Sequence, residues 1–198
     1  MGRYFGTAGI RGKANETLDV QRAFQVGRYL GYYFSRQGKG RILVGKDTRL
    51  SSGMFENAIA AGASASGADV YLLGYCPTPS VAYLVKREQF SCGVMISASH
   101  NPYYDNGIKL INSNGEKMDE ETILKIEAYI DGLSGEIPFA VRDQIGRTVD
   151  YAMGRNRYIG YLISLATRSY KNKRVGLDCA NGSSWMIAKS VFDALGAK

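Results

Sequence analysis

The chain has 198 residues, of which 45% are hydrophobic and 22% charged, as is typical of a soluble globular protein. Its 25 lysines and arginines exceed its 18 aspartates and glutamates, and the net charge of +7 favours anionic partners. It contains no run of five basic residues and no apolar run long enough for a membrane span, so we expect neither nucleic acid nor a membrane as partner. Its three cysteines are widely spaced, which argues against disulfides and a zinc site and for a cytoplasmic location.

The chain alternates between strand and helix patterns. Helices are predicted where apolar side chains recur at spacings of three and four, and strands where short apolar runs are bounded by turn residues. In chain order these patterns predict a helix over 19–37, a strand over 41–44, a helix from 51 or 52 to 66, a strand over 70–73, a helix over 79–87, strands over 92–96 and 108–111, and a helix that begins near 119. The helix that ends at 66 is crowded with alanine and glycine, which would permit close approach to a sheet.

The pattern weakens over 134–150, where Gly135, Pro138 and Gly146 interrupt it, and a domain boundary is predicted near Asp150. A helix over 151–169, a strand over 174–178 and a helix over 183–195 are predicted to follow. The predicted fold class is α/β: a mixed, mostly parallel sheet between helix layers in residues 1–149, then the start of a second α/β domain in residues 150–198.

The stretch with the richest chemistry is the predicted loop from Ser97 to Asp105. It contains Ser99 and the only histidine of the chain, His100. The dipeptide Asn106-Gly107 predicts a tight turn and an antiparallel strand pair, because both residues tolerate positive φ. A loop held between two strands at a sheet edge is a frequent place for catalytic residues.

A serine beside a histidine suggests a hydrolase, but Ser99 lies in no Gly-x-Ser-x-Gly elbow, and neighbouring residues rarely aim their side chains at one another. A loop of small residues with Lys109 at its far end suits a phosphoryl group better, because backbone N–H groups and a lysine supply donors and positive charge. A purely structural loop, whose serines only satisfy backbone groups, stays open.

Three stretches in order resemble the α-D-phosphohexomutase superfamily, and within it the bacterial phosphoglucosamine mutase subfamily. They are YFGTAGIRG from Tyr4, GKDTRLS from Gly45 and SASHNP with DNGIK from Ser97, and the likeness runs through essentially all 198 residues. One position departs from the pattern, since the subfamily usually has aspartate where Ala8 stands.

The resemblance implies a phosphohexomutase in which Ser99 carries a phosphoryl group and exchanges it with a hexosamine or hexose phosphate. A sugar 1,6-bisphosphate would be the intermediate and activator. It also implies Mg²⁺ on a phosphate oxygen of Ser99, held otherwise by aspartates of an Asp-Gly-Asp-x-Asp-Arg loop that does not occur in these residues. The chain alone is therefore expected to be inactive. A phosphomannomutase or phosphoglucomutase, a non-catalytic α/β interaction domain, a basic nucleic-acid binder and a homodimer remain open.

The resemblance also assigns roles to single residues. Lys109 would be the general acid/base or charge stabiliser, and Arg11 would face the reacting phosphoryl group. His100 is expected to orient the loop or the substrate rather than to relay a proton. The remaining expectations are structural: Asn101 fixes the turn through its side chain, and Asp47 and Arg49 form an ion pair that positions their own loop.

Overall fold

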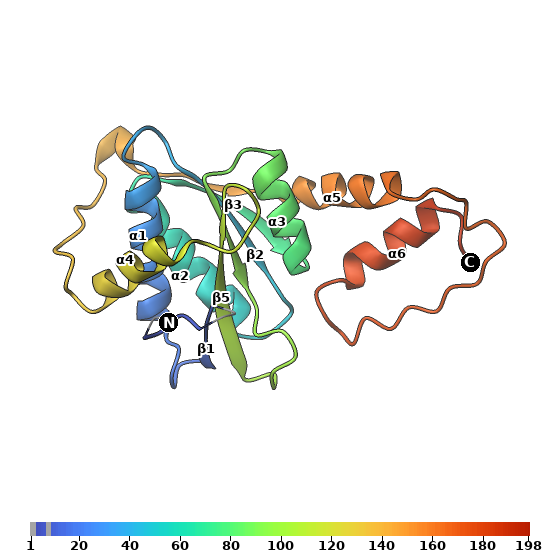
Figure 1. Ribbon diagram of the computed structural model, residues 1–198, viewed down its shortest axis with the longest axis horizontal. Helices are drawn as coiled ribbons and strands as arrows, with labels where there is room; N and C mark the ends of the chain where they lie inside the picture. The colour runs from blue at the N-terminus through green and yellow to red at the C-terminus, as the bar shows by residue number, and fades with distance from the viewer. Residues whose placement is uncertain (1–2, 7–8) are drawn as a thin grey trace.

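The computed structural model describes residues 3–6 and 9–198, so Ala8 lies outside the described residues. Figure 1 shows the arrangement of the elements along the chain. In chain order they are β1 (Ile10–Lys13), α1 (Val20–Phe34), β2 (Arg41–Lys46), α2 (Ser52–Ser64), β3 (Asp69–Tyr75), α3 (Thr78–Arg87), β4 (Cys92–Ile96), β5 (Asp105–Asn112), α4 (Glu120–Ile130), the short 3₁₀ helix η1 (Arg142–Gln144), β6 (Thr148–Asp150), α5 (Met153–Ser164) and α6 (Trp185–Ala194).

The described strands form one mixed sheet, in the order β1-β5-β4-β2-β3-β6. The strands β2, β3, β4 and β6 are parallel, whereas β5 runs antiparallel to both of its neighbours, β4 and β1. The predicted mixed, mostly parallel sheet is therefore confirmed. The antiparallel pair β4–β5 brings both ends of the loop over 97–104 to the same end of the sheet as the carboxyl end of β2.

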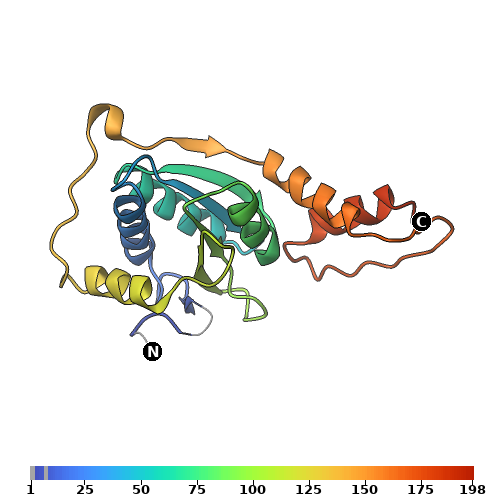
Figure 2. The same ribbon diagram turned by 45° about the horizontal axis from the view of Figure 1, so that its top comes forward.

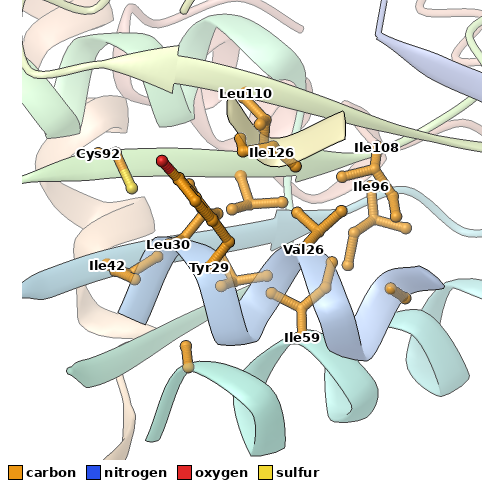
Figure 3. Close-up of a cluster of buried hydrophobic side chains, with 14 of the residues drawn as sticks. Val26, Tyr29, Leu30, Ile42, Ile59, Cys92, Ile96, Ile108, Leu110 and Ile126 are labelled. Carbon is orange, nitrogen blue, oxygen red and sulfur yellow. The ribbon is translucent and has the colours of Figure 1, made fainter. Parts of the chain in front are cut away.

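The sheet has a hydrophobic core on each face, as the prediction of two helix layers requires. Residues of β2 alternate between the two cores: Ile42 and Val44 lie in one and Leu43 in the other, because successive side chains of a strand point to opposite faces. The larger core packs against α1, α2 and α4, and Figure 3 shows Val26 and Leu30 of α1 with Ile59 of α2 beneath the strands. The smaller core lies under α3.

The small residues of α2 bring that helix close to α1 rather than only to the sheet, where the sequence analysis placed their effect. A Cβ atom on Gly62 would lie 2.2 Å from the carbonyl oxygen of Phe24, and one on Gly27 would lie 2.3 Å from that of Ile59. These distances are shorter than any real Cβ contact, so glycine at both positions is required by the close approach of the two backbones.

A buried arginine fixes the connection between α4 and β6. The side chain of Arg28 is 3% exposed and donates hydrogen bonds to the carbonyl groups of Ile137, Pro138 and Ala65 and to the hydroxyl of Ser66. Its guanidinium also lies 3.8 Å from the ring centre of Phe139. Figure 2 shows this connection running along the outside of α1 before it joins the sheet.

Two local predictions were wrong. Asn106 and Gly107 form no turn but lie inside β5, because the Asn106 amide is buried and bonds to the hydroxyls of Ser51 and Ser52 at 2.9 and 3.0 Å. Residues 174–178 form no strand, because no neighbouring strand is present beside them among the described residues. The second segment, residues 151–198, thus contains two helices and an irregular connection.

The second segment extends to one side of the sheet (Figures 1 and 2). Helix α5 contacts the first part through Tyr158 and Tyr161, whose ring centres lie 5.8 and 4.0 Å from that of Tyr83 of α3. An ion pair between Arg157 and Glu88 adds to this contact. Within the described ranges, no helix is long and apolar enough to cross a membrane.

Candidate functional site

The loop over 97–104 places Ser99 in an uncommon backbone conformation. Its φ is +58°, in the left-handed region that few residues other than glycine adopt, which indicates that the surrounding contacts impose it. The Ser99 amide donates to the hydroxyl of Ser97 at 3.0 Å, and the Ser97 amide donates to the carbonyl of Gly107 at 2.9 Å. The Ser99 hydroxyl lies 3.3 Å from Nδ1 of His100. The loop therefore presents this hydroxyl from a defined position.

Arg49 holds the loop through its carbonyl groups. Its guanidinium donates to the carbonyls of Ser99 and Asn101, both at 2.9 Å, and to those of Pro102 and Asp105. Hydrogen bonds from a charged donor are stronger than neutral ones, and a planar guanidinium can make several at once. The loop is consequently tied to the segment that follows β2.

Asp47 in turn fixes Arg49, as the sequence analysis expected. One of its carboxylate oxygens lies 3.0 Å from Nε of Arg49, and the other accepts from the Arg49 amide at 3.1 Å and the Ser52 hydroxyl at 2.7 Å. Asp47 is 8% exposed, so its charge is balanced within the protein rather than by water. The network continues to Asn106 through Ser52, which means that the supposed turn residue is a buried support of the loop.

The two expected cationic residues come from neighbouring strands. Arg11 of β1 pairs with Gly107, two residues before Lys109 on β5, so Arg11 and Lys109 lie on the same face of the sheet. Arg11 donates to the side-chain oxygen of Asn101 at 3.3 Å, and the Asn101 amide donates to Asp105 at 2.9 Å. Asn101 therefore fixes the loop through its side chain.

Lys109 is electrostatically perturbed. Burial lowers its pKa below the usual value of 10.5, and the positive charges of Arg11 and Arg49 lower it further, while Asp47 acts in the opposite direction. A lysine with a lowered pKa exchanges a proton more readily near neutral pH, which is a property of catalytic lysines.

The loop of Ser99, the residues that hold it and Lys109 line one pocket of about 840 Å³, whereas Arg11 is not among its lining residues. Of the residues predicted from the sequence, Asp47, Arg49, Ser99, His100, Asn101 and Lys109 line it. The sequence analysis missed several other lining residues, among them Thr48, Leu50, Thr78, Tyr103 and the segment 180–183. Three of them had a signal in the sequence: Thr48 and Leu50 belong to GKDTRLS, and Tyr103 belongs to the predicted loop from Ser97 to Asp105.

The carboxylates near the pocket are already engaged. Asp47 is paired with Arg49, and Asp105 accepts from Asn101. No group of three or more histidine, cysteine, aspartate or glutamate side chains in residues 3–6 and 9–198 is arranged to hold a metal ion. The described residues therefore do not fit Mg²⁺ as a complete ligand set.

The fold and the pocket define an α/β domain that presents a reactive loop at one end of its sheet. Residues 2–135 match the family described as phosphoglucomutase/phosphomannomutase, alpha/beta/alpha domain I. The chain belongs to this family.

Curated relatives cover the whole chain. It is 62% identical to a phosphoglucosamine mutase from Lachnospira eligens over 201 aligned positions, which comprise 100% of this chain and 45% of that protein. It is also 62% identical to a phosphoglucosamine mutase from Lachnoclostridium phytofermentans, with 100% of this chain and 44% of that protein covered. The chain thus spans less than half the length of these relatives.

Solved structures share the fold. A phosphoglucomutase/phosphomannomutase family protein from Burkholderia thailandensis superposes with a TM-score of 0.80 at 24% identity, over 98% of this chain and 42% of that one. At this identity the likeness shows the fold alone.

Proposed function

We propose that this chain is the phosphoserine-bearing part of a phosphoglucosamine mutase, which interconverts glucosamine 6-phosphate and glucosamine 1-phosphate through a sugar bisphosphate. The observation that carries the proposal is the pocket in which Ser99 lies with Lys109 and His100. The high identity to phosphoglucosamine mutases supports the choice of substrate. We place the protein in the cytoplasm, as its three free cysteines suggest.

The geometry suits transfer of a phosphoryl group from Ser99. A phosphoserine carries nearly two negative charges at neutral pH, so its transfer needs positive charge and aligned donors. Arg11 and Lys109 supply positive charge on the same sheet face, and the carboxylate that lines the pocket, Asp47, is neutralised by Arg49. In the forward step the bond from Ser99 Oγ to phosphorus breaks and a bond from a sugar hydroxyl oxygen to phosphorus forms.

Lys109 is our candidate for the proton transfer that accompanies this step. In its neutral form the amine accepts the proton of the attacking hydroxyl, and the lowered pKa makes that form more accessible. Lys109 passes this proton to Ser99 Oγ, which leaves as a hydroxyl. In the return step the proton moves from Ser99 Oγ through Lys109 to the sugar oxygen whose bond to phosphorus breaks. His100 orients the serine hydroxyl, from which its Nδ1 lies 3.3 Å away.

Magnesium belongs to the proposal only as a cofactor of a longer protein. The described residues supply Ser99 but no group of three or more histidine, cysteine, aspartate or glutamate side chains that could hold the ion, so no step is derived through the metal. We expect the 198-residue chain alone to bind Mg²⁺ weakly and to turn over no sugar phosphate.

A chimera tests the proposal, with this chain replacing the matching 45% of the Lachnospira eligens protein, to which it is 62% identical. The chimera should convert glucosamine 6-phosphate faster than glucose or mannose phosphate, and peptide mapping should find one phosphate on Ser99. Ser99→Ala should abolish turnover and the phosphate, whereas the matched control Ser97→Ala should keep the phosphate on Ser99. Phosphate on Ser97, or turnover that survives Ser99→Ala, would show the assignment to be wrong.

A further inference from the structure

The pocket that contains Ser99 has a second wall, which comes from the distant segment 180–183. The hydroxyl of Thr48 donates a hydrogen bond to the carbonyl oxygen of Asn181 at 2.8 Å, across 133 positions of sequence. Among the hydrogen bonds between described residues, no other side-chain bond joins residues 165–198 to residues 3–6 or 9–150. This hydrogen bond therefore ties the second wall directly to the first part of the chain.

Thr48 lies between Asp47 and Arg49, the two residues that fix the loop of Ser99, so its hydrogen bond to Asn181 links that loop to the second wall. Its neighbour Arg49 donates to four carbonyl groups at the loop of Ser99, and its other neighbour, Asp47, pairs with Arg49. Thr48 itself is exposed and reaches in the other direction, to Asn181. A single three-residue segment thus holds both walls of the pocket, and the spacing between the walls depends on it.

The backbone of the second wall is held in a defined shape. Ala180 and Asn181 both have positive φ, +47° and +53°, a conformation that costs energy at Ala180 and persists only where the surroundings impose it. The Ala180 amide donates to the side chain of Asp178 at 2.9 Å. Asn181 is exposed and lines the pocket, and its side-chain amide has no hydrogen-bond partner among the described residues.

We propose that Asn181 contacts the sugar phosphate from the wall opposite Ser99 and that Thr48 is the positioning residue that keeps it there. A carboxamide offers both donors and an acceptor, which match sugar hydroxyls and phosphate oxygens. The inference rests on the proposed function, since it concerns the same pocket. Small displacements of groups that orient a substrate can cost up to ~100-fold in rate, so a loosened wall should slow turnover.

The test compares Thr48→Val, which has the same shape but no hydroxyl, with Thr48→Ser, which keeps the donor. In the chimera, Thr48→Val should lower kcat/KM for glucosamine 6-phosphate about 10-fold, within the range for a misplaced orienting group, and Thr48→Ser should restore most of it. Thr167→Val, at an exposed threonine in the second segment, residues 151–198, is the control and should change nothing. Equal kcat/KM for Thr48→Val and Thr48→Ser would overturn the positioning role.

Asn181→Gly tests the contact itself, because it keeps the carbonyl that Thr48 binds and tolerates the positive φ. It should raise KM about 10-fold, the cost of about one hydrogen bond to a charged group, and an unchanged KM would overturn the contact. Hydrogen exchange separates this inference from the proposed function. Amides over 179–184 should exchange faster in Thr48→Val than in Thr48→Ser even if the chimera turns over no sugar phosphate. Identical exchange would overturn the role of Thr48 as the positioning residue.

Discussion

Removing the guanidinium of Arg49 should destabilise the protein substantially. The side chains of Arg49 and Asp47 are only 9% and 11% exposed, so Arg49→Met leaves a buried carboxylate without its partner. Breaking a buried pair in this way typically costs about 3–5 kcal/mol. For a protein of this size, each 1 kcal/mol lowers the melting temperature by about 2–4 °C, which gives an expected decrease of roughly 6–20 °C.

Thermal unfolding of the 198-residue chain, followed by circular dichroism, measures this decrease. Arg49→Lys should recover little, because one ammonium group cannot span the carbonyls of Ser99, Asn101, Pro102 and Asp105. Lys125→Met, which removes an exposed pair with Glu121, is the control and should not change the melting temperature. A melting temperature of Arg49→Met within 2 °C of the wild type would correspond to a loss of at most ~1 kcal/mol in the free energy of unfolding. The guanidinium would then not be what holds the loop.

Two further predictions concern packing and charge. Gly27→Ala should destabilise the chain, because the added Cβ forces α1 away from Ile59. Gly160→Ala should stabilise it by ~0.5–1 kcal/mol, because a Cβ there would have no atom within 4 Å. Urea unfolding compares the two variants, and equal changes in stability would refute the packing argument. Lys109→Met should lower kcat of the chimera by ~100-fold without lowering stability at pH 7. Burial and Arg11 lower the pKa of Lys109 in the folded protein, so stability rises with pH between that pKa and 10.5, and a melting series from pH 8 to 11 should lose this rise in Lys109→Met. If stability still rose with pH in Lys109→Met, the lowered pKa of Lys109 would not be the cause of the rise.

Much of the first part could be predicted because its signals are local. The strands β2 and β4 are short apolar runs, and α1 carries its apolar face at helical spacing, so periodicity alone located them. The ion pair of Asp47 and Arg49 could be expected because the two residues are neighbours in one short motif.

The errors and omissions have a common physical origin in contacts between distant residues. Asn106 has the chemistry of a turn residue, but bonds to two serines more than fifty positions away hold it in a strand. Residues 174–178 have a strand-like composition, yet a strand exists only where a partner lies beside it. The hydrogen bond from Thr48 to Asn181 could not be predicted, because the sequence around neither residue indicates a contact with the other.

The connection over 131–147 is attached to the first part of the chain. This attachment restricts the positions that the second segment can take relative to the first part. A free chain of about 15 residues has a root-mean-square end-to-end distance of ~20 Å, so it would leave the second segment free to take many positions. Here Arg28 holds Ile137 and Pro138, while the amides of Ala140 and Gly146 bond to the end of α2 at 2.8 and 2.9 Å. Little free chain remains, so the effective concentration of the second segment near the pocket is set by a tether anchored in the core.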